Sequence, residues 1–346
     1  MMKVVFSFCI VLFAVGLVFA IDTNPLFPIE VNDKTGFIDH TGRIVIEPKY
    51  ETARRFSEGL ARVVIDGKWG FIDKAGTIVI PPTFVDAYDF SEGLARVQLF
   101  GRTFDEPRSY GFIDRSGKVV IKAISSELHG VAETSEGFHQ GLAMIEIDWW
   151  KGFINRRGKI VIDPQFSSAY HFTPEGLAAV ESGDNKKMGY INKVGHWAIQ
   201  PRFDYASLFS EGVAPVSLKR KCGFIDSKGH FVLHPFRSRG DCTVITGQFN
   251  DGLSRWRIGG KFGYINRRGK VVIRPEFKYT DHFSEGMAEV SFDGLHWGFI
   301  NKSGRLVIAP EFDHVDSFEH GLARVIVEGG IGYIDKSGKY VWKPSR

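Results

Sequence analysis

The chain has 346 residues, of which 43% are hydrophobic and 24% charged, and its formal net charge is +4. An apolar fraction of this size can bury a core, so the composition excludes an intrinsically disordered chain. None of the three cysteines belongs to a Cys-x-x-Cys pair or a Cys/His ligand set, which gives no support for a zinc site.

The first twenty residues, MMKVVFSFCIVLFAVGLVFA, have the form of a secretory signal peptide. Lys3 precedes an apolar run, and Val18 and Ala20 place small residues at the two cleavage positions. We predict cleavage after Ala20 and a secreted or periplasmic location, with no nucleic-acid partner and no transmembrane segment after cleavage. Residues 4–20 are just long enough to span a bilayer, so an uncleaved membrane anchor is the alternative.

The rest of the chain, residues 21–346, repeats one phrase. The motif Gly-[Phe/Tyr]-Ile-[Asp/Asn]-x-x-Gly occurs nine times at intervals of 34 to 41 residues, beginning at Gly36, Gly70, Gly111, Gly152, Gly189, Gly223, Gly263, Gly298 and Gly332. A second motif, Phe-x-x-Gly-[Leu/Val/Met]-[Ala/Ser], lies between the copies. A period of this size indicates a repeat architecture. The nine units start near residues 26, 59, 93, 141, 176, 212, 252, 286 and 321.

The second unit illustrates the elements that each repeat is expected to form. Residues 60–65 (LARVVI) are rich in β-branched side chains and predict a strand. Asp66-Gly67 is a dipeptide favoured in tight hairpins, and residues 69–72 (WGFI) form the next strand. Residues 73–76 (DKAG) read as a turn, and residues 77–80 (TIVI) as a third strand. Each unit is therefore predicted to be a three-stranded antiparallel meander.

The connections between units are predicted to be short helical turns. Pro82 ends the third strand because proline has no N–H to donate to the ladder. Phe84, Ala87 and Phe90 then recur at three-residue spacing, which suits one turn with an apolar face. The fold class expected is thus an all-β repeat protein of nine three-stranded units in an open, twisted solenoid. No strand is left over at either end to close a ring, although a closed ring resembling a β-propeller is the alternative.

The repeated phrase GKWGFIDKAG with its downstream FSEGLA resembles the WG-repeat family, also called KWG repeats. The resemblance covers roughly residues 26–344, although the Trp-Gly pair itself survives only at Trp69-Gly70 and Trp297-Gly298. It implies an interaction scaffold with no assigned activity.

No residue set in the sequence predicts catalysis, a cofactor or a metal site. The Asp or Asn of the Gly-Phe-Ile-Asp motif recurs in every unit, and the glutamates Glu58, Glu92, Glu211 and Glu285 also recur, so both sets are interpreted as structural. The eleven histidines show no metal-binding spacing, and His314 and His320 merely lie six residues apart. Cys222 and Cys242 either form a disulfide or remain separate thiols.

The charge distribution points to a binding surface. Residues 151–274 contain 21 Lys and Arg against 9 Asp and Glu, a net charge of +12. The candidate binding residues on this basic edge are Arg156, Arg157, Lys219, Arg220, Lys221, Arg237, Arg239, Arg267 and Arg268. We predict a non-catalytic scaffold that binds a protein or an acidic polymer, such as an acidic glycan or a phosphate polymer. The alternative reading is ordinary solvated turn residues.

Two rival functions remain open at this stage. A carbohydrate-active enzyme on a propeller-like ring would need two facing acids that break the repeat, for which Asp105, Glu106 and Asp148 are candidates. A self-assembling envelope component would use exposed seams at the ends of a solenoid. Departures from the repeat, such as Trp149-Trp150 at a predicted hairpin tip, are places where a binding site is expected.

Overall fold

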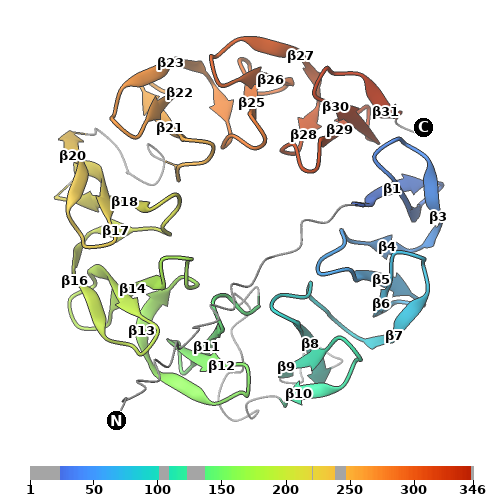
Figure 1. The fold of residues 1–346 in the computed structure, drawn as a ribbon, viewed down its shortest axis with the longest axis horizontal. Coiled ribbons are helices and arrows are strands. Elements are labelled where there is room, and N and C mark those ends of the chain that lie inside the picture. The colour runs from blue at the N-terminus through green and yellow to red at the C-terminus, as the bar shows by residue number, and fades with distance from the viewer. Residues whose placement is uncertain (1–23, 101–108, 123–136, 220, 238–246, 344–346) are drawn as a thin grey trace, which may run out of the picture.

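The computed structural model describes residues 24–100, 109–122, 137–219, 221–237 and 247–343. Within them the chain forms strands and turns but no helix, and the strands build a closed ring around a central opening (Figure 1). Each repeat contributes one meander of three antiparallel strands, and the units follow one another around the ring in chain order. The ring is a β-propeller.

The first strands of the meanders are β1 (Phe27–Val31), β5 (Ala61–Ile65), β8 (Leu94–Phe100), β11 (Leu142–Ile147), β14 (Leu177–Ser182), β18 (Val213–Leu218), β21 (Leu253–Ile258), β25 (Met287–Ser291) and β29 (Leu322–Val327). The middle strands, which carry the Gly-Phe-Ile motif, are β2 (Lys34–Ile38), β6 (Lys68–Ile72), β9 (Ser109–Asp114), β12 (Trp150–Asn155), β15 (Met188–Asn192), β19 (Lys221–Asp226), β22 (Lys261–Asn266), β26 (Trp297–Asn301) and β30 (Gly330–Asp335).

The third strands are β3 (Ile44–Tyr50), β7 (Ile78–Phe84), β10 (Val119–Ile121), β13 (Ile160–Ala169), β16 (Trp197–Phe203), β20 (Phe231–Arg237), β23 (Val271–Phe277), β27 (Leu306–Phe312) and β31 (Tyr340–Trp342). Four connectors add a short strand that pairs with the first strand of the next meander, namely β4 (Thr52–Ala53), β17 (Tyr205–Ala206), β24 (Tyr279–Thr280) and β28 (His314–Val315).

Hydrogen bonding joins the described strands into eight sheets, the blades of the propeller. Four of these sheets have four strands, three have three, and one has six. The six-stranded sheet holds two repeat units, because the long strand β13 pairs with β12 through its first half and with β14 through its second half.

The predicted helical-turn connectors and purely three-stranded units are wrong. The segment with Phe84, Ala87 and Phe90 is extended, and Ala87 forms a β-bridge with Val97. All three apolar residues nevertheless belong to one core cluster. The connector crosses from the outer strand of one blade to the inner edge of the next, so its side chains enter the same inter-blade core without needing a helical period.

The predicted open solenoid is also wrong, because the last unit packs against the first. The Tyr333 ring lies 5.5 Å from that of Phe27 between centroids, and the Tyr333 hydroxyl donates a hydrogen bond of 2.8 Å to the Pro28 carbonyl. Ile29 and Ile38 are buried in the same cluster with Leu322. In the described residues, the ring closes without a strand of one terminal unit joining the sheet of the other. Packed side chains hold the last unit against the first, as they do at the other contacts between neighbouring units.

Aromatic pairs fill those other seams. In eight units the Phe or Tyr of the middle strand packs against the Phe that opens the next Phe-x-x-Gly motif. The pair Phe71 and Phe90 is typical, with ring centroids 5.0 Å apart and a T-shaped arrangement. Edge-to-face pairs of this kind are favourable beyond the area that they bury. The two sequence motifs are thus the two halves of one inter-unit contact.

The glycine and the acid of the repeated motif have separate structural causes. A Cβ atom on Gly70 would lie 2.7 Å from the Ile80 carbonyl oxygen, because the third strand bulges against this point. The Asp39 carboxylate accepts hydrogen bonds from the N–H groups of Thr41 and Arg43 and from the Thr41 hydroxyl. The hydroxyl bond and the backbone bonds outweigh the effect of burial and lower the pKa of Asp39 to about 2. The structural interpretation of this repeated Asp or Asn is confirmed.

Successive turns alternate between the two ends of the strands, which defines two faces of the ring. The Phe-x-x-Gly hairpins and the Asp-x-x-Gly turns lie at one end, called here the turn face. The hairpin tips between the first and middle strands lie at the other end, called the tip face. Among the described residues, no helix is long and apolar enough to cross a membrane.

Candidate functional site

The Phe-x-x-Gly hairpins on the turn face are two-residue turns that surround the central opening (Figure 1). In the second unit the Ser57 N–H and carbonyl both bond to Leu60, at 2.9 and 3.1 Å. Between them, Glu58 has φ +51° and Gly59 has φ +82°, the conformation of a type I′ turn. A glutamate with a left-handed backbone conformation is unfavourable. We therefore expect its side chain to make contacts that offset this cost.

The compensation is a belt of carboxylates, defined here as Glu58, Glu92, Glu175, Glu211, Asp251 and Glu285. Each belt carboxylate accepts a hydrogen bond from the glycine N–H of the next hairpin around the ring, at distances between 2.6 and 3.1 Å. The Glu58 carboxylate, for example, accepts from Gly93 at 2.9 Å. The structural interpretation of the repeated glutamates is therefore confirmed.

Serine hydroxyls add a second set of links between the hairpins. Ser57, Ser91, Ser210 and Ser284 each donate to the carbonyl of the next unit's Phe, at distances between 2.5 and 2.7 Å. Together the carboxylate links and the serine links join six pairs of neighbouring units at the innermost part of the ring. They fix the width of the opening.

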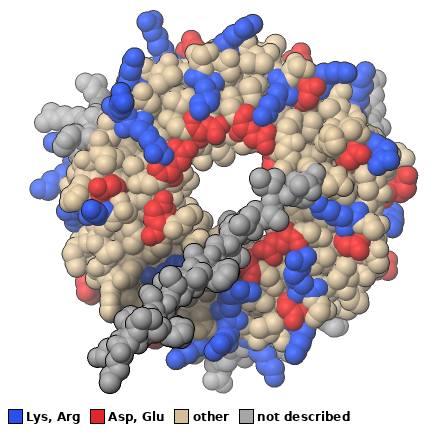
Figure 2. Space-filling view, in the orientation of Figure 1, with Lys and Arg blue, Asp and Glu red and all other residues tan. Residues whose placement is uncertain are grey.

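The opening is negatively charged. Figure 2 shows Asp and Glu side chains gathered around it, with most Lys and Arg side chains farther out. Two belt members are neutralised, since Arg267 lies 2.8 Å from Glu211 and Lys336 lies 3.1 Å from Glu285. Burial raises the pKa of Glu285, but hydrogen bonds from Lys336 and Gly321 outweigh it and leave this pKa below its ordinary value. Within the described part of the chain, Glu58 and Glu92 have no ion-pair partner.

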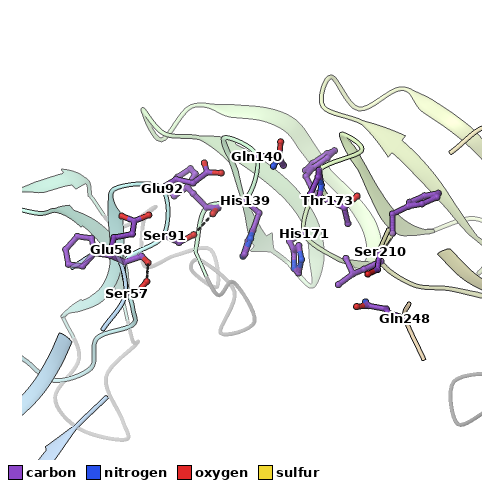
Figure 3. A pocket seen from close by; sticks show the side chains of 16 residues that line it. Ser57, Glu58, Ser91, Glu92, His139, Gln140, His171, Thr173, Ser210 and Gln248 are labelled. Atoms are coloured by element: carbon purple, nitrogen blue, oxygen red, sulfur yellow. Dashed lines mark hydrogen bonds between the residues drawn. The ribbon is translucent and has the colours of Figure 1, made fainter. Parts of the chain in front are cut away.

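Both sets of links are interrupted between the fourth and fifth units. His139 and Gln140 replace the usual Ser-Glu, and neither is bonded to the next hairpin, which carries an extra residue, Pro174. Instead the His139 ring stacks on the His171 ring with centroids 4.2 Å apart (Figure 3). The His139 Nε2 atom is buried and has no hydrogen-bond partner in the described residues.

A cavity of about 540 Å³ lies at this interruption and extends over the neighbouring hairpins (Figure 3). Its polar lining comprises Ser57, Glu58, Ser91, Glu92, His139, Gln140, His171, Thr173, Ser210 and Gln248. Its apolar wall comprises Phe90, Phe138, Phe172, Pro174, Leu208 and Phe209. Carboxylates and side-chain amides beside phenylalanine rings suit a ligand group that is cationic and rich in N–H donors.

At one position of the repeat, the residue that lines the cavity differs between units. The residue that precedes the Phe of the Phe-x-x-Gly motif is His171, Leu208 and Gln248 in three lining units. The equivalent residue is Asp89 or His282 in other units. The cavity is therefore lined by recurring hairpin residues, such as Glu58 and Glu92, together with side chains at this one position that differ from unit to unit. This is the pattern expected of a binding surface on a repeated scaffold.

The predicted basic edge is divided between the two faces. Arg156, Arg157, Arg267 and Arg268 occupy equivalent turns on the turn face, in two units separated by two others. Lys219 and Lys221 flank a hairpin tip on the opposite face. Arg237 ends β20, whereas Arg220 and Arg239 lie outside the described residues. The structure therefore does not bring the set into one stripe, and its role in binding stays a prediction.

The remaining candidates are placed as follows. Cys222 is fully buried and disulfide-bonded, while Cys242, the partner predicted for it, lies outside the described residues. Asp148 sits at a hairpin tip on the tip face, away from the opening, and Asp105 and Glu106 are not described. His314 pairs with Asp316 at 3.4 Å. Among the described residues, no group of three or more His, Cys, Asp or Glu side chains is placed to hold a metal ion.

Sequence reasoning missed His139 and His171. The available signal was their departure from the repeat, because the hairpin of the fourth unit reads His-Gln where four other units read Ser-Glu. Without the ring, however, residues 32 positions apart gave no reason to expect stacked rings.

The family model for the WG containing repeat matches residues 36–69, 69–99, 110–148, 152–185, 188–222, 262–295 and 297–330, more than half of the chain. The chain is a WG-repeat protein. The family resemblance inferred from the Gly-Phe-Ile-Asp motif is thus confirmed. A comparison with curated proteins found no match.

This WG-repeat protein is similar to several solved structures. A crystal structure of the eukaryotic initiation factor aligns with a TM-score of 0.64 and 12% identity, over 92% of this chain and 95% of that one. Dihydro-heme d1 dehydrogenase NirN in complex with DHE has a TM-score of 0.49 and 14% identity, over 83% and 74%. BamB from Moraxella catarrhalis has a TM-score of 0.43 and 8% identity, over 90% and 92%. At these identities the likeness concerns the fold alone.

Proposed function

We propose that this WG-repeat protein is a non-catalytic scaffold that binds a basic segment of a partner protein at its central opening. The observation that carries the proposal is the pair Glu58 and Glu92, carboxylates that line the cavity without an ion-pair partner among the described residues. Neither carboxylate forms an ion pair with a lysine or arginine of the described chain. Each can therefore bind a lysine or arginine side chain of a partner protein. The bidentate geometry of a guanidinium matches a carboxylate best.

Two further features favour binding of a partner's side chain in this cavity over catalysis. The His139 and Gln140 side chains add polar groups to the lining of the cavity. The acid that most clearly breaks the repeat, Glu289, replaces arginines found at the equivalent positions 62, 96, 255 and 324, but it is only 4% exposed and does not line the cavity. A hydrolase would need two accessible acids facing one substrate. The predicted export of the chain rests on residues 1–20, which lie outside the described residues.

Peptide binding to the full mature chain tests the proposal. Fluorescence anisotropy would compare a labelled Arg-Gly repeat peptide with a Glu-Gly peptide of the same length. We expect binding of the basic peptide only, weakening as salt rises because the contact is between exposed charges. The E58Q/E92Q variant should bind about two- to thirtyfold more weakly, since each exposed pair contributes about 0.2–1 kcal/mol.

A matched control removes the same charge elsewhere. Glu47 and Glu311 are exposed on the outer strands β3 and β27, so E47Q/E311Q should bind like the wild type. Glutamine keeps an oxygen that can accept from the neighbouring glycine N–H, which preserves the belt. Preference for the acidic peptide, or equal loss in both double variants, would contradict the proposal.

A further inference from the structure

The tip face, opposite the carboxylate belt, carries protruding apolar side chains on one arc of the ring. Trp149 is 72% exposed at the tip between β11 and β12, and Leu295 is 70% exposed just before β26. Ile258, at the end of β21, is 55% exposed. These tips belong to the part of the ring that runs from β11 to β26 in Figure 1. Because the tips are equivalent in the repeat, all three side chains lie at the same end of the ring.

Trp149 occupies a position that the fold does not favour for it. It has φ +70°, and the equivalent residue in the second unit is Gly67, with φ +67°. A bulky side chain in this region is strained, and glycine is the residue that a type I′ turn prefers. Trp149 thus combines a strained backbone with a largely exposed side chain. Strain of this kind points to a role outside folding.

Lysines lie between these apolar tips. Lys186, Lys219, Lys221 and Lys261 are exposed on the same face and have no ion-pair partner in the ranges that the structure describes. The described tips of the first, second and ninth units are different, because they carry Asp33, Asp66 and Glu328, with Lys34 and Lys68 beside them, and no exposed large apolar side chain. Among the described tips, the exposed large apolar side chains therefore lie on one arc, where unpaired lysines accompany Asp148, Asp184 and Asp293.

We propose that this arc docks on an anionic lipid bilayer, with Trp149, Ile258 and Leu295 inserted at headgroup depth. Single apolar side chains on separate tips form no groove for a peptide, but they can enter one plane together. Tryptophan is the side chain most enriched at membrane interfaces, and basic residues near a bilayer are attracted by anionic headgroups. The arc whose described tips lack exposed large apolar side chains would tilt away from the surface. This docking is independent of the proposed peptide binding and leaves the carboxylate belt facing away from the membrane.

Vesicle co-sedimentation with the full mature chain tests the docking. We expect binding to vesicles of phosphatidylcholine mixed with phosphatidylglycerol, and none to phosphatidylcholine alone. The W149S/L295S variant should lose about tenfold in partition coefficient because it loses the inserted apolar groups. The K186E/K219E variant should lose at least about fivefold for each lysine replaced. The control V79S/V272S changes two side chains that are each 39% exposed on the outer strands, and it should bind like the wild type.

Several results would overturn the proposal. One is equal binding to neutral and anionic vesicles, or binding to neither. Another is wild-type binding by W149S/L295S together with complete displacement by soluble polyglutamate, which would identify a polyanion site that does not need a bilayer. Thermal unfolding of each variant shows whether a loss of binding comes from misfolding. A separate W149G variant should melt no lower than the wild type, because glycine relieves the strain of the positive φ at that turn.

Discussion

The inter-unit seam makes a quantitative prediction for Phe90→Ala. Phe90 is 2% exposed, and its ring meets that of Phe71 at 5.0 Å in a cluster that also contains Leu60 and Ile113 from the adjoining blades. Truncating a buried Phe to Ala costs about 3–5 kcal/mol through lost burial and the cavity that remains. The aromatic pair accounts for about 0.5–1.5 kcal/mol of that cost. We therefore expect the free energy of unfolding to fall by about 3–5 kcal/mol.

Urea denaturation, extrapolated linearly to water, measures this change. Phe292→Ala is the matched control, because Phe292 is 43% exposed and should cost only about 1 kcal/mol through its contact with Phe277. A loss below about 1 kcal/mol for Phe90→Ala, or an equal loss in both variants, would show that Phe90 does not seal an inter-blade core.

Three more changes probe the turns and the belt. Gly70→Ala should lower the free energy of unfolding by about 1–3 kcal/mol, since its Cβ would meet third-strand backbone; an unchanged urea midpoint would refute the close approach. Asp39 has a folded pKa of about 2 against an ordinary 3.8, so the stability it contributes is present above about pH 4 and lost as the pH falls towards about 2. Asp39→Asn should therefore flatten the dependence of the melting temperature on pH in that window, and an equally steep curve would contradict the turn's role. Glu92→Ala should cost about 1–3 kcal/mol because it leaves the Gly141 N–H without its acceptor, whereas Glu92→Gln should cost clearly less.

The local structure of each unit was predictable from the sequence. The motifs gave strands 61–65 and 68–72 almost as expected, because β-branched runs, an Asp-Gly pair and an Asp-x-x-Gly turn act over a few residues. The prediction that Pro82 ends the third strand is wrong, since this strand runs from Ile78 to Phe84. The connectors were misread because three-residue spacing does not distinguish a helical turn from an extended segment that passes through a shared core.

The closed ring and the candidate site depended on distant contacts. Closure rests on Tyr333 packing against Phe27 and bonding to Pro28, and nothing in the local sequence shows that residues about 300 positions apart meet. The open solenoid was predicted because no strand was left over at either end to close a ring. That argument failed because side-chain packing between the last and first units closes the ring. The stacking of His139 on His171 and the spread of Arg156 and Lys219 over opposite faces likewise follow from the ring geometry.

The measurement that tests the central claim most directly is photo-crosslinking of an Arg-Gly repeat peptide to the full mature chain, with the linked residues identified by mass spectrometry. The account predicts that cross-links concentrate on the hairpins at 57–59, 91–93, 139–141 and 171–176, which border the cavity, and that they disappear in E58Q/E92Q. Cross-links that fall mainly on the outer strands or on the tip face, and that persist in the variant, would contradict the claim that the carboxylate-lined opening is the binding site.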